Sequence, residues 1–281
     1  MADVLQVERR DAVTVVRLNR PEKMNALDDE LIETLIETGR SLARDPGVRA
    51  VVLCGNGPGF CGGLDTAKFA AQRDGAALVP EHADGPADRW GDLGVEGLRL
   101  GRGQQAVWVW KLLPVPVVVA VHGAAVGAGL QLALAGDVRF AGPDAKLGAL
   151  EIRWGIMPDM GGTQLLPGLI GLDRARDLIY TGRVVRGDEA GRWGLVTHVA
   201  DDPLESALRY ADAIAEKNPH AIRNGKALTA LAEQVSREGL VAERRAMWAT
   251  VGSPNQLEAV RAAVERRPAV FADWAPGDAS L

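Results

Sequence analysis

The chain has 281 residues, of which 32 are Lys or Arg and 37 are Asp or Glu; its formal charge of −5 argues against a nucleic-acid-binding protein, which would carry a basic surplus. Apolar residues make up 47% of the chain, which is enough for a sizeable core and excludes a largely disordered protein. The two cysteines, Cys54 and Cys61, are too few for a disulfide scaffold or a thiolate zinc site, so we expect a cytoplasmic protein.

The first predicted elements are a hairpin, a helix and a buried strand. Residues 5–8 and 13–18 are β-rich runs on either side of a polar turn, which predicts a β-hairpin at the start of a sheet. Apolar residues then recur at helical spacing over residues 28–43, where Asp28 is a suitable N-cap. The apolar run at residues 48–54 predicts a buried strand that ends at a glycine-rich loop.

The same strand, loop and helix pattern recurs further along the chain. Strands are predicted at residues 117–121, 138–141 and 196–199, and helices at 128–135, 163–166 and 173–180. From residue 203 to about residue 267 the pattern is helical. We therefore expect an α/β core over residues 1–200 and a helical C-terminal region over residues 201–281.

Two further stretches affect this division. Residues 112–134 form the longest apolar stretch, but prolines and glycines interrupt it, and charged residues near the N-terminus interrupt any signal peptide. No membrane segment is therefore expected.

Residues 73–103 are rich in Gly, Asp and Pro and longer than an ordinary loop, which predicts an insertion or a lid over the site.

Two glycine-rich loops carry the strongest functional indication. Residues 59–65 leave one buried strand, and residues 122–130 leave another and enter a helix. Both expose backbone N–H groups, and the first-turn amides of a helix are unpaired, so the loops suit a developing negative charge. Alternatively, the glycines only permit tight packing. The spacing matches neither a P-loop nor a dinucleotide fingerprint, so nucleotide hydrolysis is not expected.

In chain order, five groups of motifs resemble the crotonase (enoyl-CoA hydratase/isomerase) superfamily over residues 4–200. They are Leu18-Asn19-Arg20-Pro21 with Asn25-Ala26-Leu27, Phe60 to Asp65, Pro116 to Val138, Met157 to Gln164, and Thr181-Gly182-Arg183 through Gly194-Leu195-Val196. The resemblance implies a crotonase-like α/β spiral of ββα turns with a helical C-terminal trimerisation region. It further implies an acyl-CoA substrate and a homotrimer or a hexamer built as a dimer of trimers. No metal and no cofactor are expected, because coenzyme A is part of the substrate.

The resemblance also implies residue roles. Two backbone amides of that family hold the thioester oxygen, and the matching positions here are Gly62 and Ala128. The implied substrate-binding residues are Lys23, Met24, Ala26, Gly63, Leu64, Asp65 and Gln131. Hydratases of the family use two glutamates, whose positions hold Gln131 and Glu151 here. Asp159 falls where dienoyl-CoA isomerases carry an aspartate, although those enzymes also keep an acid at the position of Gln131.

Each of these polar residues also has a purely structural interpretation. Glu151 has apolar neighbours and could form a buried ion pair with an arginine, and Asp159 could be a turn or N-cap residue. Asp65 could cap a helix. His122 is expected to be a hydrogen-bonded residue at a strand end, and Cys61 has no histidine nearby in sequence to make it a nucleophile.

The expected reaction is double-bond isomerisation of an enoyl-CoA through an oxyanion-stabilised enolate. Glu151 alone could remove a proton at C2 and return it at C4. One alternative is a 2-enoyl-CoA hydratase in which Glu151 is the single base and Gln131 holds the water. An alternative of another class is a non-catalytic acyl-CoA-binding protein, which the presence of Glu151 and Asp159 argues against.

Overall fold

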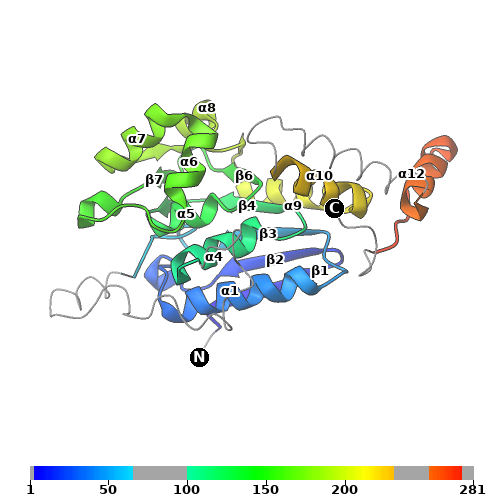
Figure 1. Ribbon diagram of the computed structural model, residues 1–281, viewed down its shortest axis with the longest axis horizontal. Coiled ribbons are helices and arrows are strands. Elements are labelled where there is room, and N and C mark those ends of the chain that lie inside the picture. Colours follow the sequence, from blue (N-terminus) through cyan, green and yellow to red (C-terminus); the bar gives the residue numbers. More distant parts are fainter. Residues whose placement is uncertain (1–2, 66–99, 231–252, 274–281) are drawn as a thin grey trace.

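The main sheet begins with the predicted hairpin (Figure 1). The computed structural model describes residues 3–65, 100–230 and 253–273. Strand β1 (Leu5–Arg10) forms one edge of the sheet and is mostly exposed, whereas five of the six residues of β2 (Val13–Leu18) are buried. The two strands pair antiparallel with Leu5 opposite Leu18. The hairpin prediction is confirmed.

The rest of the main sheet is parallel. Its further strands are β3 (Ala50–Gly55), β4 (Val117–Val121), β6 (Val138–Ala141) and β9 (His198–Val199). The order is β1-β2-β3-β4-β6-β9, and each pair from β2 onward is parallel. β3 and β4 are buried along their whole length, because helices cover both faces of a parallel sheet.

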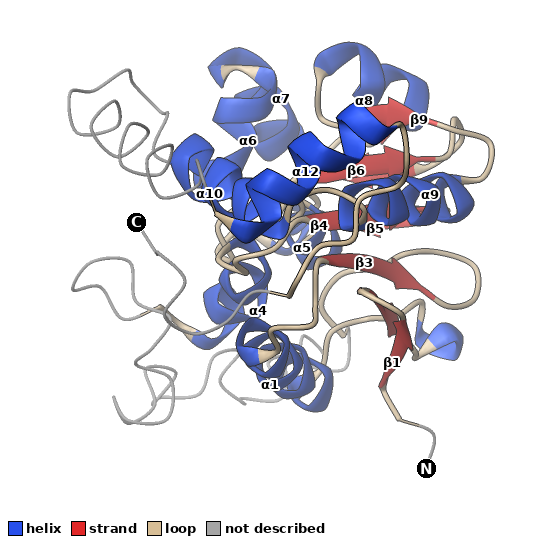
Figure 2. Ribbon diagram, turned by 90° about the vertical axis from the view of Figure 1, so that its right-hand side faces the viewer, coloured by secondary structure: helices blue, strands red, loops and turns tan. Residues whose placement is uncertain are grey.

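Helices pack on the two faces of this sheet (Figure 2). On one face, α1 (Asp29–Arg44) and α4 (Arg102–Lys111) contribute to a cluster of buried side chains that includes Leu35, Val51 and Val119. On the other face, α9 (Pro203–Ala215) covers Val52 and Val118. Alternate residues of one strand therefore fill two separate layers of core.

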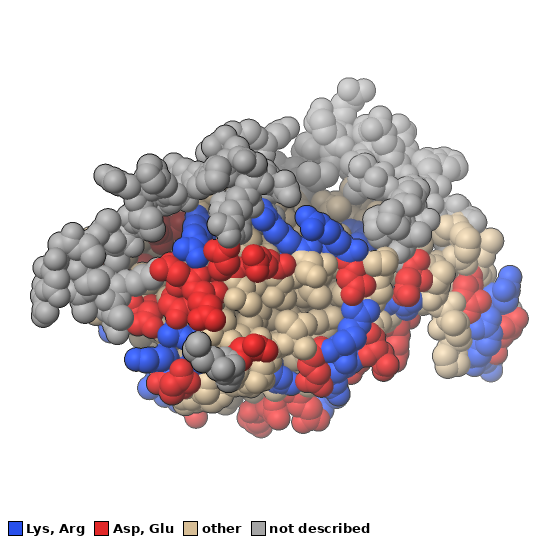
Figure 3. All heavy atoms as spheres, turned by 90° about the horizontal axis from the view of Figure 1, so that it is seen from below, with Lys and Arg blue, Asp and Glu red and all other residues tan. Residues whose placement is uncertain are grey.

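Helix α1 begins at the predicted N-cap, and two salt bridges join it to α4. The Asp28 carboxylate accepts a hydrogen bond from the Leu31 amide at 2.9 Å, which confirms the predicted N-cap. Arg102 of α4 forms salt bridges with Asp29 at 2.9 Å and with Glu33 at 3.0 Å. The underside of the molecule, where α1 lies in Figure 1, carries acidic and basic side chains side by side (Figure 3).

A second, smaller sheet builds the wall of the candidate site. Its strands are β5 (Ala124–Val126), β7 (Lys146–Gly148) and β8 (Val185–Arg186), in the order β5-β7-β8. Helix α5 (Ala128–Ala133) starts two residues after β5, and the short 3-10 helix η3 (Glu151–Trp154) starts three residues after β7. The sequence patterns missed these strands because two or three residues are too few to show a period.

The remaining elements are helical. They are η1 (Pro21–Lys23), α6 (Gly162–Ile170), α7 (Leu172–Thr181), α8 (Gly187–Trp193), α10 (Pro219–Ala230) and α12 (Pro254–Glu265). The described residues beyond 202 therefore form the expected helical region. Among the described helices, none is both long and apolar enough to cross a lipid bilayer. Most of the predicted insertion or lid at residues 73–103 lies outside the described residues, and residues 102–103 open α4.

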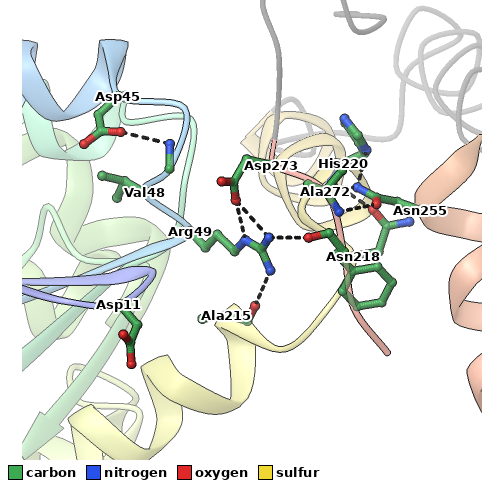
Figure 4. Close-up of polar contacts among 12 residues, drawn as sticks. Asp11, Asp45, Val48, Arg49, Ala215, Asn218, His220, Asn255, Ala272 and Asp273 are labelled. Atoms are coloured by element: carbon green, nitrogen blue, oxygen red, sulfur yellow. Dashed lines mark hydrogen bonds and ion pairs between the residues drawn. The ribbon is translucent and has the colours of Figure 1, made fainter. Parts of the chain in front are cut away.

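Residues 271–273 are anchored to Arg49, which precedes β3 (Figure 4). The Arg49 guanidinium donates to the Phe271 carbonyl at 2.8 Å, to the Asp273 carboxylate at 2.8 Å and to the Ala215 carbonyl at 3.2 Å. The Asn255 side chain exchanges two hydrogen bonds with the backbone of Ala272, at 2.9 and 2.8 Å. These contacts join the helical region to the α/β core within one chain.

Candidate active site

The fold brings the two glycine-rich loops together. The Cys61 amide donates to the Ala124 carbonyl at 2.8 Å, and the Val126 amide donates to the Cys61 carbonyl at 3.1 Å, so residues 59–65 run alongside β5. Gly129 allows this approach, because a Cβ at that position would lie 2.4 Å from the Cys61 carbonyl oxygen. The first requirement of the predicted site, proximity of the two loops, is met.

Asn25 holds the first loop in place. Its side chain is fully buried and donates to the carbonyls of Asn56, Gly59 and Phe60 at 2.8, 2.9 and 3.1 Å. Its own backbone has φ of 54°, a left-handed conformation that asparagine tolerates better than most residues. The sequence motif contains Asn25 but did not reveal this role, which depends on carbonyls more than thirty residues away.

The hydrogen bonding of Gly62 argues against its predicted role as an oxyanion donor. Its N–H already donates to the Met24 carbonyl at 2.7 Å. Leu64 is better placed: it forms a parallel bridge with Leu27, in which the Leu27 amide donates to Gly63 and the Leu27 carbonyl accepts from Asp65. In such a bridge, the N–H of Leu64 points away from Leu27. That direction is toward the β5 side of the loop.

The second donor is at the start of α5. Ala128 is the first residue of that helix, so its N–H has no acceptor within the helix. It lies beside the first loop, because a Cβ on Gly63 would be 3.8 Å from the Ala128 nitrogen. The amides of Leu64 and Ala128 therefore form a pair of backbone donors at the junction of the two loops.

Glu151 lies next to this pair. The residue is 6% exposed, and its Oε1 would be 3.7 Å from a Cβ on Gly127, the residue that precedes α5. Oε1 accepts a hydrogen bond from Gln131 at 2.7 Å, whereas Oε2 is buried and has no hydrogen-bond partner among the described residues. No described Lys or Arg forms a salt bridge with it, so the structure does not support the buried ion pair.

Burial and charge shift the Glu151 carboxyl toward its protonated form. Desolvation raises the pKa of Glu151, and the negative charge of Asp159 raises it further. Hydrogen bonds from the backbone and from Gln131 act in the opposite direction, because they stabilise the carboxylate. A carboxyl group with a raised pKa and one free oxygen is suited to general acid/base catalysis.

Gln131 connects Glu151 to the loop that carries Asp159. The Gln131 side chain is 1% exposed; its Oε1 accepts from the amides of Met160 at 2.8 Å and Gly162 at 2.9 Å. Gly162 is the first residue of α6, so the Gln131 carbonyl supplies the acceptor that a capping side chain would otherwise provide. Gln131, Glu151 and the Asp159 loop thus form one connected group.

Asp159 belongs to this group without being buried in it. The residue is exposed, yet the surrounding protein removes enough water to raise the pKa of Asp159. Its influence on Glu151 shows that the two carboxylates share one electrostatic environment. The N-cap residue of α6 is Gly161. Asp159 therefore does not have the N-cap role that its position in the sequence also allowed.

The other residues predicted to bind substrate surround the first loop. Asp65 forms a salt bridge with Arg20 at 3.2 Å, and Arg20 also binds Asp28 at 2.9 Å, so the Asp65 carboxylate anchors the loop. Lys23 and Met24 are exposed at the adjacent turn. Ala26 accepts a hydrogen bond from Arg20. Contact of these residues with a substrate stays a prediction.

The two other polar residues of the loops have structural roles. Burial raises the pKa of Cys61 to about 12, and its sulfur lies 3.0 Å from the Asn25 carbonyl, so the thiol is not a nucleophile at neutral pH. The His122 ring lies 2.8 Å from the Gly57 carbonyl, as expected for a hydrogen-bonded residue at a strand end.

Comparisons with known proteins identify the family. The model of the enoyl-CoA hydratase/isomerase family matches residues 8–84 and 103–274. A protein of Mycobacterium bovis named as a probable enoyl-CoA hydratase is 34% identical over 272 residues, covering 96% of this chain and 98% of the relative. Mouse mitochondrial methylglutaconyl-CoA hydratase is 31% identical over 269 residues, covering 93% and 80%.

A solved structure shows the same relationship. The enoyl-CoA hydratase from Bacillus anthracis superposes with a TM-score of 0.81 at 32% identity, covering 95% of this chain and 98% of that one. The likeness confirms the predicted crotonase-like α/β fold. The chain is therefore an enzyme of the enoyl-CoA hydratase/isomerase family, the crotonase superfamily that its motifs resemble.

Proposed function

We propose that this enzyme isomerises 3-enoyl-CoA to 2-enoyl-CoA, with Glu151 as the single acid/base. The observation that carries the proposal is the asymmetry of the Glu151 carboxylate. Gln131 holds Oε1 at 2.7 Å, whereas Oε2 is buried and bonded to no described residue. A carboxyl group with a raised pKa and one free oxygen is sufficient for a reaction that removes a proton and returns the same proton.

In the first step Glu151 Oε2 takes a proton from C2. The C2–H bond breaks, its electron pair moves into the conjugated system, and the negative charge develops on the thioester oxygen. The amides of Leu64 and Ala128 are proposed to hold that oxygen. Donors that are already fixed lower such a barrier by several kcal/mol, since they need no reorganisation during the reaction.

In the second step the proton leaves Oε2 and forms a bond with C4. The double bond then lies between C2 and C3, the thioester carbonyl is restored, and Glu151 is again a carboxylate. Because the same group acts first as base and then as acid, a pKa raised toward neutrality serves both steps. No step requires a metal or a cofactor other than the coenzyme A of the substrate.

Hydration of a 2-enoyl-CoA is the second candidate, and the names of the Mycobacterium bovis and mouse relatives favour it. In that reaction Glu151 Oε2 would take a proton from water. The Gln131 oxygen already accepts two backbone hydrogen bonds, so it cannot also accept one from that water. A non-catalytic acyl-CoA-binding role is less well supported, because burial of an unpaired carboxylate is unfavourable.

A substrate panel tests the proposal. The purified protein is incubated with 2-enoyl-, 3-enoyl- and 2,4- or 3,5-dienoyl-CoA in water labelled with heavy oxygen, and products are identified by mass and ultraviolet absorbance. We expect 3-enoyl-CoA to become 2-enoyl-CoA without uptake of label. Labelled 3-hydroxyacyl-CoA as the main product from 2-enoyl-CoA, without isomerisation of 3-enoyl-CoA, would establish the hydratase instead. A homotrimer or hexamer and a cytoplasmic location remain predictions.

A further inference from the structure

Gln131 makes three hydrogen bonds: its oxygen accepts from the amides of Met160 and Gly162, and its NH₂ group donates to Glu151, the proposed acid/base. We infer that Gln131 is a positioning residue: it makes Oε2 of Glu151 the proton-carrying atom and keeps a negative charge away from the position beside Oε1. This inference rests on the proposed acid/base role of Glu151. It assigns the choice of reaction to a side chain that does not itself react.

The direction of the Gln131 amide is determined by its neighbours. Two N–H groups, of Met160 and Gly162, point at one end of the side chain at 2.8 and 2.9 Å. That end must therefore be the carbonyl oxygen, because an NH₂ group there would face two donors. The NH₂ group consequently faces Glu151 and can only donate to it.

The amide is also confined sterically. It is 1% exposed, and a Cβ on Gly162 would lie 2.9 Å from its oxygen. The 2.7 Å separation between Nε2 of Gln131 and Oε1 of Glu151 leaves no space for a water molecule between them. A reacting water would therefore have to bind at Oε2 alone, without a second carboxylate to hold it.

A carboxylate at position 131 would change the charge of the group. It would keep the two backbone hydrogen bonds but place a second anionic oxygen beside Oε1 of Glu151. Two carboxylates at that separation do not both ionise readily, so one of them would retain a proton. Position 131 has the two N–H donors, so the proton would remain on Glu151. Asp159 is the other charged group that acts on Glu151, and it also favours the protonated form.

Three variants separate these effects. Gln131→Glu keeps the acceptor for the two amides but removes the donor to Glu151. Gln131→Met has a similar volume and removes both. The exchange Gln131→Glu with Glu151→Gln restores one amide and one carboxylate but reverses their positions. Three quantities are measured for each variant. They are the pH dependence of isomerisation, the ratio of hydration to isomerisation, and the NMR titration of the isotopically labelled Glu carboxyl groups.

In Gln131→Glu we expect the acidic limb of kcat/KM to move up by about one pH unit or more, as for a coupled carboxylate pair. Isomerisation at pH 7 should fall by roughly tenfold and recover at higher pH, and the share of hydration should rise. Gln131→Met should move the limb in the same direction without a gain in hydration. The exchange variant should fold normally yet not recover isomerisation. Its side chain at position 151 is an amide, which cannot take the proton that Oε2 of Glu151 is proposed to take.

The outcomes distinguish this inference from the proposed function. An unchanged Glu151 titration and reaction ratio in both Gln131→Glu and Gln131→Met would overturn the inference even if the wild-type protein is an isomerase. Failure of the wild-type protein to isomerise any substrate would overturn the proposed function, while the NMR titration would still report whether Gln131 controls Glu151. If Gln131→Glu does not fold, the Glu151 titration and the reaction ratio of Gln131→Met provide the decision.

Discussion

The two halves of the site are built by different means. The proposed anion-binding half consists of the backbone amides of Leu64 and Ala128, whose directions follow from strand pairing and from the start of a helix. The proposed acid/base half consists of the side chains of Gln131, Glu151 and Asp159: Gln131 donates a hydrogen bond to Glu151, and the charge of Asp159 raises the pKa of Glu151. We therefore expect the first half to be less sensitive to side-chain identity than the second, where one substitution should change the reaction.

Removal of the acid/base group should produce the largest effect. Glu151→Gln is expected to lower kcat by about 10²- to 10⁴-fold, because proton transfer is lost. Affinity for a saturated acyl-CoA should stay within a few-fold of wild type, since the backbone donors remain. Steady-state kinetics and calorimetric titration measure the two quantities. A variant that turns over at the wild-type rate would exclude Glu151 as the main acid/base.

Removal of one backbone donor should have the next largest effect. Ala128→Pro deletes the N–H at the first position of α5, where helices accept proline, and should lower kcat by about 10²- to 10³-fold. Gly62→Ala is a control for crowding of the first loop: it keeps every backbone N–H, although its Cβ would lie 3.1 Å from the Met24 Cβ, so kcat should fall much less than in Ala128→Pro. A kcat close to wild type in folded Ala128→Pro would exclude the Ala128 N–H as an oxyanion donor.

Removal of the neighbouring charge should shift the pH dependence by a smaller amount. The negative charge of Asp159 raises the pKa of Glu151, so Asp159→Asn should lower that pKa. Because the carboxylate form is the base, the acidic limb of kcat/KM should move to lower pH, opposite to the shift expected for Gln131→Met. A pH–rate profile of both variants checks the signs, and shifts in the same direction would contradict the electrostatic account.

The smallest expected effect is on stability. Burial raises the pKa of folded Glu151 above its unfolded value, so stability falls as pH rises from the unfolded pKa, about 4.3, through the folded pKa. Glu151→Gln removes this penalty and should be more stable than wild type at pH 8, with a difference that shrinks toward pH 4. Thermal unfolding across this range measures it. A variant that is less stable at pH 8 would indicate that the carboxylate has a stabilising partner.

The sequence predicted those parts of the fold that have a clear local pattern. The hairpin, the Asp28 cap and strand β4 were recognisable because alternation, capping chemistry or an apolar run lies within a few residues. Strands β7 and β8 were not, because their pairing joins residues nearly forty positions apart. Short strands of this kind are determined by tertiary pairing.

The same limit applies to the site. The motifs brought Glu151, Asp159 and Ala128 to attention, but they indicated Gly62 as the other donor, whereas the backbone pairing favours Leu64. The direction of an N–H depends on its pairing partner, which the motif does not show. Gln131 was identified as a departure from the hydratase pattern. Its hydrogen bonds to Glu151 and to residues 160 and 162 connect positions 20 to 31 apart in sequence, which no local pattern shows.

The path of the proton tests the central claim most directly. Wild-type enzyme is given 3-enoyl-CoA with deuterium at C2, and the 2-enoyl-CoA formed in a single turnover is analysed for deuterium at C4. If Oε2 of Glu151 carries the proton in a buried site, a substantial part of the label should appear at C4, and Glu151→Gln should abolish both turnover and transfer. Isomerisation at the wild-type rate in Glu151→Gln, with label still transferred, would contradict the single-base mechanism.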